Sequence, residues 1–265
     1  MNIHIDQATF EELQKATILS IKIGSRMYNL ENSSSDTDML HIIATPTGWT
    51  NSLVWTHHNL QYKADDVDHV FTTLQNFIRN ILKGDSTINY ECLYSKEIEN
   101  SSLAFLSDIR LKFNNYSLLR SYLGLVRRDL KNFSQGYDSK KLFHAVRGLW
   151  TANQIMQNTY SNDIKQVDLS TYTYLHELKN GIISDRRVLI AKMKEISEAT
   201  DSLRAKITEL LNNKLMNRIM EPSSLKSLDK NLKQFCLTKD YTEKIISDIE
   251  VTDIYQIINT DITYT

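Results

Sequence analysis

Two aspartates one residue apart, Asp36 and Asp38, have the types and spacing in this sequence that most suggest chemistry. They open an apolar run, DTDMLHIIAT, directly after three serines. Like charges at the edge of a buried strand repel each other and resist burial, so a bound cation is the first explanation for the pair. Alternate residues of a strand share one face, which places both carboxylates side by side. Carboxylate oxygens suit hard cations, and the pair predicts a site for Mg²⁺ or Mn²⁺.

A Gly-Ser pair, Gly24 and Ser25, directly follows the preceding apolar segment at residues 16–23. Glycine permits close backbone approach, and exposed amides at such a turn can receive phosphate oxygens. A phosphate-holding turn beside a metal-holding carboxylate pair supplies what phosphoryl transfer needs. Each signal alone is weak, because aspartates after serines are also common turn and capping residues. Their order and spacing favour the functional interpretation.

The elements that must position these residues fall into two parts. Apolar residues follow helical spacing at 7–16 and 65–85, and Asp65 or Asp66 and Gly84 are expected to cap the second helix. Four segments are predicted as strands: 16–23, 36–45, 51–64 and 87–95. From residue 101 the pattern is almost wholly helical, and the polar stretch 95–102 is the candidate boundary. The predicted fold class is α+β, with an N-terminal mixed sheet and flanking helices followed by a C-terminal all-helical domain.

Composition limits the possible partners. The chain has 265 residues and a formal net charge of -1, so no global field attracts nucleic acid or an anionic membrane. No apolar run approaches the ~20 residues that span a bilayer, so no membrane partner is expected. The two cysteines, Cys92 and Cys236, form no metal-ligand spacing and favour a reduced, cytoplasmic setting. Nothing in the sequence indicates the oligomeric state.

The stretch GSRMYNL…SSDTD resembles the signature of the DNA polymerase β-type nucleotidyltransferase superfamily, which is Gly-Ser, a spacer and Asp-x-Asp. It is most similar to a group of predicted bacterial and phage nucleotidyltransferases, some associated with RNA repair, through Gly24, Ser25, Arg26 and Tyr28. Asn29 stands where that group usually has glycine. The segments LKGDSTINYECLYS, YLGLVRRDL and DSKKLFHAVRGLW are also similar to the group, so the likeness covers residues 20 to 155.

The resemblance implies a nucleotidyltransferase catalytic domain at 1–100 and a helical domain at 101–265 that closes the substrate cleft. It also implies a third carboxylate, and Glu91 on the predicted strand 87–95 fits that role. The alternative for this glutamate is an exposed position on an edge strand. The predicted catalytic and metal-binding residues, around two metal ions, are therefore Asp36, Asp38 and Glu91.

The predicted helix at 138–152 carries cations that match the group's Lys-Lys-x-x-His-x-x-Arg pattern. Lys140, His144 and Arg147 form one stripe, which could line a cleft and grip a triphosphate. The alternative is a solvated polar face. Arg26 could serve the same purpose or pair with an acid, and Tyr28 could pack against the base or fill a core. The predicted nucleotide-binding residues are Gly24, Ser25, Arg26, Lys140, Lys141, His144 and Arg147.

The predicted function is metal-dependent transfer of a nucleoside monophosphate from a nucleoside triphosphate, with ATP favoured, to a hydroxyl acceptor. Pyrophosphate is released, and the acceptor is an RNA end, a protein side chain or a small molecule. The alternative is a non-catalytic relative that binds nucleotide or a partner protein through the same fold. The presence of three candidate acids favours the enzyme, because a binding module has no need of them.

Overall fold

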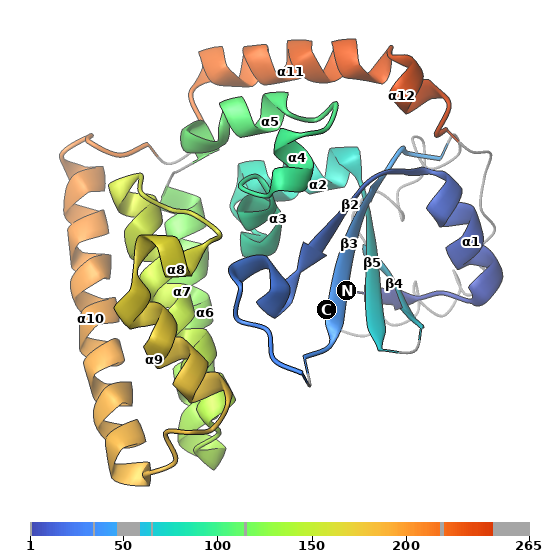
Figure 1. Ribbon diagram of the computed structural model, residues 1–265. Coiled ribbons are helices and arrows are strands. Elements are labelled where there is room, and N and C mark those ends of the chain that lie inside the picture. Colours follow the sequence, from blue (N-terminus) through green and yellow to red (C-terminus); the bar gives the residue numbers. More distant parts are fainter. Residues whose placement is uncertain are drawn as a thin grey trace, which may run out of the picture.

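The computed structural model describes residues 2–33, 35–46, 59–64, 66–113, 116–217 and 220–245. A mixed five-stranded sheet stands beside a tall group of helices, and a last long helix crosses over both (Figure 1). This arrangement confirms the predicted α+β class. The first part of the predicted segment 51–64 and the C-terminal residues 246–265 lie outside the described residues.

The sheet has the strand order β1-β4-β5-β3-β2. Strand β3 lies between β2, which runs antiparallel to it, and β5, which runs parallel. Strand β4 is antiparallel to β5 and parallel to β1, which the sequence did not predict. The strands are β1 (Asn2–His4), β2 (Thr17–Ile23), β3 (Thr37–Ile43), β4 (Asn59–Ala64) and β5 (Val67–Thr73).

Helix α1 covers one face of the sheet, and all later helices lie on the other side or beyond it (Figure 1). A short 3-10 helix, η1 (Gly24–Tyr28), follows β2, and a second, η4 (Arg110–Phe113), precedes the long helices. No helix in the described ranges is long and apolar enough to cross a membrane. The α-helices are α1 (Gln7–Lys15), α2 (Leu74–Lys83), α3 (Thr87–Cys92), α4 (Lys96–Glu99), α5 (Phe105–Asp108), α6 (Tyr116–Gly136), α7 (Ser139–Gln157), α8 (Ile164–Val167), α9 (Leu169–Lys179), α10 (Arg186–Asn212), α11 (Pro222–Cys236) and α12 (Lys239–Thr242).

The predicted helix at 65–85 is only half correct. Residues Val67–Thr73 form strand β5, and α2 begins at Leu74. The N-cap is Thr73, whose hydroxyl accepts from the Asn76 amide at 3.2 Å, rather than Asp65 or Asp66. Gly84 does end the helix in a left-handed conformation with φ 71°, as predicted. The error arose because Val67 and Val70 continue the helical spacing of α2 backwards, although on β5 residues three apart lie on opposite faces.

The predicted strand at 87–95 is also wrong, because this segment forms helix α3 and a following turn. Ser86 caps the helix, and its hydroxyl accepts from the Asn89 amide at 3.2 Å. Tyr90, Cys92 and Leu93 are all fully buried. Because these adjacent positions are all buried, the segment shows neither alternation nor a helical stripe, so the pattern could not distinguish the two structures.

One continuous core joins the sheet to the helices. Alternate residues of β3, Leu40 and Ile42, pack in it together with residues of α6, α7 and α10. The predicted boundary at 95–102 is part of this core, because it contains α4 and buries Ile98 completely. A smaller cluster fills the space between α1 and the opposite sheet face, where Ile43 and Phe71 point.

Candidate active site

Asp38 and Asp68 are paired across the parallel strands β3 and β5. Paired residues of neighbouring strands point to the same sheet face. Asp38 lies on the same face of β3 as the core residues Leu40 and Ile42, because the three are two residues apart. Both carboxylates therefore lie on the face that carries the helices. Asp36 precedes β3 by one residue. Sequence reasoning missed Asp68, because the predicted helix at 65–85 concealed its place on a strand.

The three aspartates, Asp36, Asp38 and Asp68, act on one another electrostatically. Burial raises the pKa of Asp38, and the neighbouring charges of Asp68 and then Asp36 raise it further. Lys140 and Lys63 oppose this effect. The ammonium of Lys63 lies 3.7 Å from a carboxylate oxygen of Asp68. We call Asp36, Asp38 and Asp68 the acid group; its negative charge is only partly compensated.

The Gly-Ser turn lies directly against this acid group, as the motif predicts. Gly24 has φ +68°, and a Cβ atom placed on it would come within 2.3 Å of Asp38 Oδ2. Only glycine satisfies both the backbone angle and the approach of the carboxylate. Asn29 ends η1 with φ 57°, a left-handed conformation that asparagine tolerates where the related group has glycine.

Three cations from three separate elements gather beside the acid group: Arg26 of η1, Lys140 of α7 and Lys179 of α9. Burial lowers the pKa of Lys179, and the positive charges of Lys140 and Arg26 lower it further. Within the described ranges none of the three makes an ion pair. The buried Nε of Arg26 has no hydrogen-bond partner among those residues either. The charge of Glu31 opposes this effect at Lys179, and Lys140 acts on Asp38, yet three cations held this close together still favour an anionic ligand.

Glu91, the third predicted carboxylate, is held by contacts within the protein. Its side chain is fully buried, and both carboxylate oxygens are occupied by protein groups. Oε1 accepts from the Tyr122 hydroxyl at 2.7 Å and from Nη1 of Arg147 at 3.1 Å. Oε2 accepts from the Tyr28 hydroxyl. The contacts of Glu91 thus give it a structural explanation, because a charge so deeply buried needs a cation and hydroxyl donors; its convergence with Asp36 and Asp38 stays a prediction.

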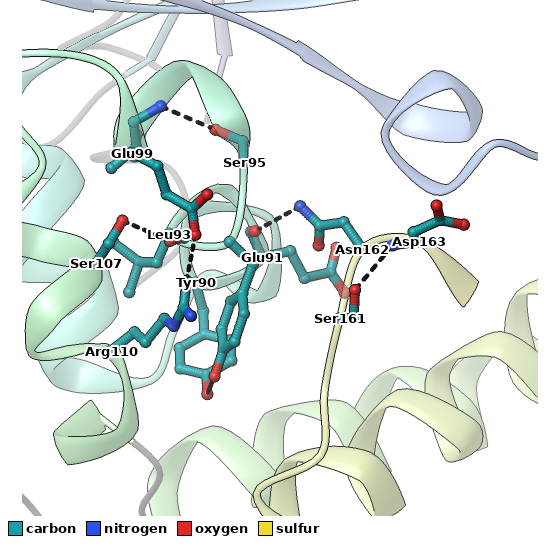
Figure 2. Close-up of polar contacts among 12 residues, drawn as sticks. Tyr90, Glu91, Leu93, Ser95, Glu99, Ser107, Arg110, Ser161, Asn162 and Asp163 are labelled. Atoms are coloured by element: carbon teal, nitrogen blue, oxygen red, sulfur yellow. Dashed lines mark hydrogen bonds and ion pairs between the residues drawn. The ribbon is translucent and has the colours of Figure 1, made fainter. Parts of the chain in front are cut away.

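The backbone around Glu91 is also held from several sides. Asn162 donates to the Glu91 carbonyl at 3.3 Å, and Ser107 donates to the Leu93 carbonyl at 3.1 Å (Figure 2). Arg110 pairs with Glu99 at 2.7 Å close by. Helix α3 therefore connects the sheet to the helical part, and the Glu91 side chain carries the charged contacts of this connection.

The predicted cationic stripe of α7 does not stay together. Lys140 is exposed near the acid group, and the half-buried Lys141 adjoins it. Burial, followed by the charge of Arg147, lowers the pKa of His144 to about 4, so this imidazole is neutral near pH 7. Arg147 is only partly buried, with 18% of its side chain exposed, and its guanidinium lies 4.3 Å from the centre of the Tyr28 ring. Seven residues advance a helix by about 10 Å, which separates Arg147 from Lys140 along α7.

The sheet, the Gly-Ser turn and the aspartates at β3 and β5 agree with the polymerase β-type nucleotidyltransferase pattern. A family model described as the RNA repair pathway DNA polymerase beta family matches residues 2–237, and the chain belongs to that family. The match extends well beyond residues 20 to 155, where the motifs lie.

Comparison with curated proteins finds no match. Among solved structures, a nucleotidyltransferase-like protein from Exiguobacterium sibiricum 255-15 is similar over 86% of this chain and 87% of its own. The identity is 14% and the TM-score 0.35, so the fold and site rest on this chain's own residues.

The class implies a divalent metal ion, and the acid group fits one by its chemistry. All donors are carboxylate oxygens, which suit Mg²⁺ and Mn²⁺. The pKa of Asp38 is raised first by burial and then by the charges of Asp68 and Asp36, and a bound cation would offset the repulsion among these carboxylates. As the side chains stand, no three acid, histidine or cysteine residues of the described part form a metal-binding group.

Proposed function

We propose that this chain transfers a nucleoside monophosphate from a nucleoside triphosphate, with ATP the first candidate, to a hydroxyl acceptor. The observation that carries the proposal is the meeting of Asp36, Asp38 and Asp68 with unpaired cations beside the Gly24 turn. Acids that hold a cation and bases that hold an anion are both needed for a metal-bound polyphosphate.

Each group has a separate role in the proposal. Asp36, Asp38 and Asp68 would hold the metal, which, when bound, neutralises phosphate charge. Gly24 and Ser25 would approach the phosphates with their backbone. Arg26, Lys140 and Lys141 would bind the terminal phosphates and stabilise the leaving pyrophosphate. His144 is close enough to Lys140 and Lys141 to sense their charge, and as a neutral ring it would offer a hydrogen bond rather than a cation.

The proposed reaction is a single in-line displacement. The acceptor oxygen forms a bond to the α-phosphorus, and the bond from that phosphorus to the oxygen bridging to the β-phosphate breaks. Pyrophosphate leaves with the bond's electrons. The proton of the acceptor hydroxyl passes to a carboxylate oxygen of Asp68, which acts as general base. Glu91 and Arg147 have no part in this step, because their charged groups are already paired inside the protein.

An RNA end is the acceptor to test first, because the description of the family names an RNA repair pathway. A terminal ribose hydroxyl supplies the required nucleophile. The face of α7 and α9 beside the acid group is rich in lysine, which suits a polynucleotide phosphate as well as a nucleotide. A protein side chain or a small-molecule hydroxyl remains the alternative acceptor in the same assay.

The experiment is incubation with each α-labelled nucleoside triphosphate, Mg²⁺ or Mn²⁺, and RNA with a free terminal hydroxyl or a cell extract. We expect label in an acceptor with wild type and at least a ~100-fold loss in Asp38→Asn and Asp68→Asn, on the scale of a lost catalytic group. Asp66→Asn, an exposed acid two residues away, is the matched control. Full activity in Asp68→Asn would remove Asp68 from the site. Nucleotide binding without transfer to any acceptor would favour the non-catalytic alternative.

The same variant makes a stability prediction. Because the pKa of Asp38 is raised in the folded protein, the ionised carboxylate destabilises the fold. This loss of folding stability is absent below the ordinary aspartate pKa and develops as pH rises through the raised pKa of the folded protein. Without metal, Asp38→Asn should therefore melt above wild type at about pH 7.5, and the difference should shrink towards about pH 4. Added Mg²⁺ should stabilise wild type alone; equal stabilisation of both proteins would show that Asp38 is not a ligand.

A further inference from the structure

The C-terminal end of α9 holds the loop that leads into the acid group. The ammonium of Lys179 donates to the Leu30 carbonyl at 2.7 Å and to the Ser35 hydroxyl at 2.8 Å. The next residue, Asn180, accepts from the Asn32 side chain at 2.5 Å. Lys179 and Asn180 belong to none of the sequence motifs, yet they contact the segment between the two motif halves.

The contacts of Lys179 fall on a turn that is already organised. The Ser35 hydroxyl accepts from the Asn32 amide at 2.9 Å and donates to Asn32 Oδ1 at 2.8 Å. The Ser35 amide donates to the Asn32 carbonyl at 3.0 Å. The Ser35 oxygen therefore uses its proton and both lone pairs, the second for Lys179. Asp36 is the next residue, so the contact between α9 and Ser35 holds the backbone directly before this acid.

Placing an ammonium at this position is unfavourable on electrostatic grounds alone. Burial and the charges of Lys140 and Arg26 lower the pKa of Lys179. A cation near a metal site also repels the metal. If Lys179 contributed only charge, removing it would strengthen metal binding. The hydrogen bonds to Leu30 and Ser35 point to the opposite effect.

We propose that Lys179 is a positioning residue, with Asn180 as its second anchor, that fixes Leu30, Asn32 and Ser35 from the helical part and so keeps Asp36 beside Asp38 and Asp68. The inference rests on the proposed function only in taking the acid group as a metal site. It gives the helical part a specific task, because α9 reaches across the chain to set the geometry of acids on the sheet.

The test is Mn²⁺ binding without nucleotide, followed by the electron paramagnetic resonance signal of the free ion. Lys179→Met should bind Mn²⁺ about 3- to 10-fold more weakly than wild type, which is the effect of one lost hydrogen-bond anchor. Asn180→Ala should weaken binding in the same direction without any change of charge. Lys179→Arg, which can reach the same acceptors, should recover part of the affinity.

Lys140→Met is the matched control, because it removes an equal charge close to Asp38 but no described hydrogen bond to the loop. Its Mn²⁺ affinity should equal or exceed that of wild type. If Lys179→Met behaves like Lys140→Met, with equal or tighter binding, Lys179 acts only as a charge and the proposal is overturned.

Amide hydrogen exchange separates this inference from the proposed function. Peptides covering residues 30–38 should exchange faster in Lys179→Met and Asn180→Ala, and at the wild-type rate in Lys140→Met. This measurement needs no metal. If wild type binds no Mn²⁺, the acid group is not a metal site and the proposed function fails, whereas unchanged exchange in Lys179→Met removes the anchor itself. Melting temperatures of all variants exclude general unfolding as the cause.

Discussion

Arg147 has Glu91 as its ion-pair partner at 3.1 Å and the Tyr28 ring beneath its guanidinium. Tyr28, Glu91 and Arg147 each belong to a motif that resembles the nucleotidyltransferase pattern, and they come from η1, α3 and α7. They meet inside the core, behind the acid group, together with Tyr122 of α6. A motif residue can therefore support a site without touching its ligand, by joining the elements that carry the ligand-binding residues.

A double-mutant cycle tests this role. Removing one partner of a buried ion pair leaves the other charge uncompensated, so Arg147→Met should lower the free energy of unfolding by about 3–5 kcal/mol. Combining it with Glu91→Gln should cost less than the two single effects added together, because the stranded charge is gone. Denaturant unfolding measures all three variants.

The control for this cycle is Arg127→Met, which breaks the exposed pair with Asp201 and should change stability by less than about 1 kcal/mol. If Arg147→Met unfolds like wild type yet binds nucleotide weakly, the original assignment of Arg147 to a phosphate-binding stripe is correct and the structural role is wrong.

Residue types predicted part of the candidate site. Gly24, Arg26, Asp36, Asp38 and Lys140 were singled out from residue spacing together with the family resemblance, and the structure groups them near one another. Glu91 was singled out but its surroundings were not foreseen, because burial depends on helices far along the chain. Lys179 gave no signal, since a lysine near the end of a helix is ordinary until its partners are known.

At the scale of elements, the strands β2 and β3 and helix α1 were predicted within two residues at each end. The prediction missed strand β5 for a physical reason. Phe71 packs in the cluster beneath α1, while Val70 packs against the main core, so apolar residues occupy both faces. A strand covered on both sides loses the alternation that identifies it. That loss concealed Asp68.

The β3–β5 pairing also brings two histidines together, and their environment predicts how the stability of the fold changes at low pH. His41 Nε2 lies 2.9 Å from His69 Nδ1, and the Ser20 hydroxyl lies 2.8 Å from His41 Nδ1. Burial, followed by the charge of His69, lowers the pKa of His41 to about 4. As pH falls from about 6.5, His41 takes up a proton in the unfolded chain but stays neutral in the folded protein. The free energy of unfolding therefore declines until about pH 4.

His41→Gln should remove most of this pH dependence, which is worth about 3 kcal/mol at most. Urea unfolding at several values between pH 7 and pH 4 measures the slope of stability against pH. His4→Gln, at an exposed histidine of β1, is the control. An unchanged slope in His41→Gln would assign the acid sensitivity elsewhere, with the half-buried His144 as the next candidate.

At the scale of the whole molecule, the sheet and the helices share a single core. Leu40 of β3, Ile98 of α4, Val126 of α6 and Ile207 of α10 belong to one buried cluster. The division into 1–100 and 101–265, which the sequence predicted, describes the change from mixed to helical structure. The buried cluster continues across residue 100, so each part covers apolar surface of the other.

The chain should consequently unfold in one cooperative transition. Circular dichroism at a helical wavelength and tryptophan fluorescence should give the same midpoint. A fragment of residues 1–100 should not fold on its own, because it lacks the helices that cover its main core face. Two separated transitions, or a folded fragment with dispersed amide resonances, would show two independent domains instead.

Tyr241 of α12 joins the last described helix to the N-terminal part of the chain. Its hydroxyl accepts from the Thr45 amide at 3.4 Å and from the Gln75 side chain at 3.2 Å, after α11 has crossed the top of the molecule (Figure 1). Synthesis runs from the N-terminus, so β3 and α2 leave the ribosome long before these contacts can form. The half-made chain must keep an uncovered apolar surface until α11 arrives, which gives chaperones a period in which to bind it and makes premature termination costly to the cell.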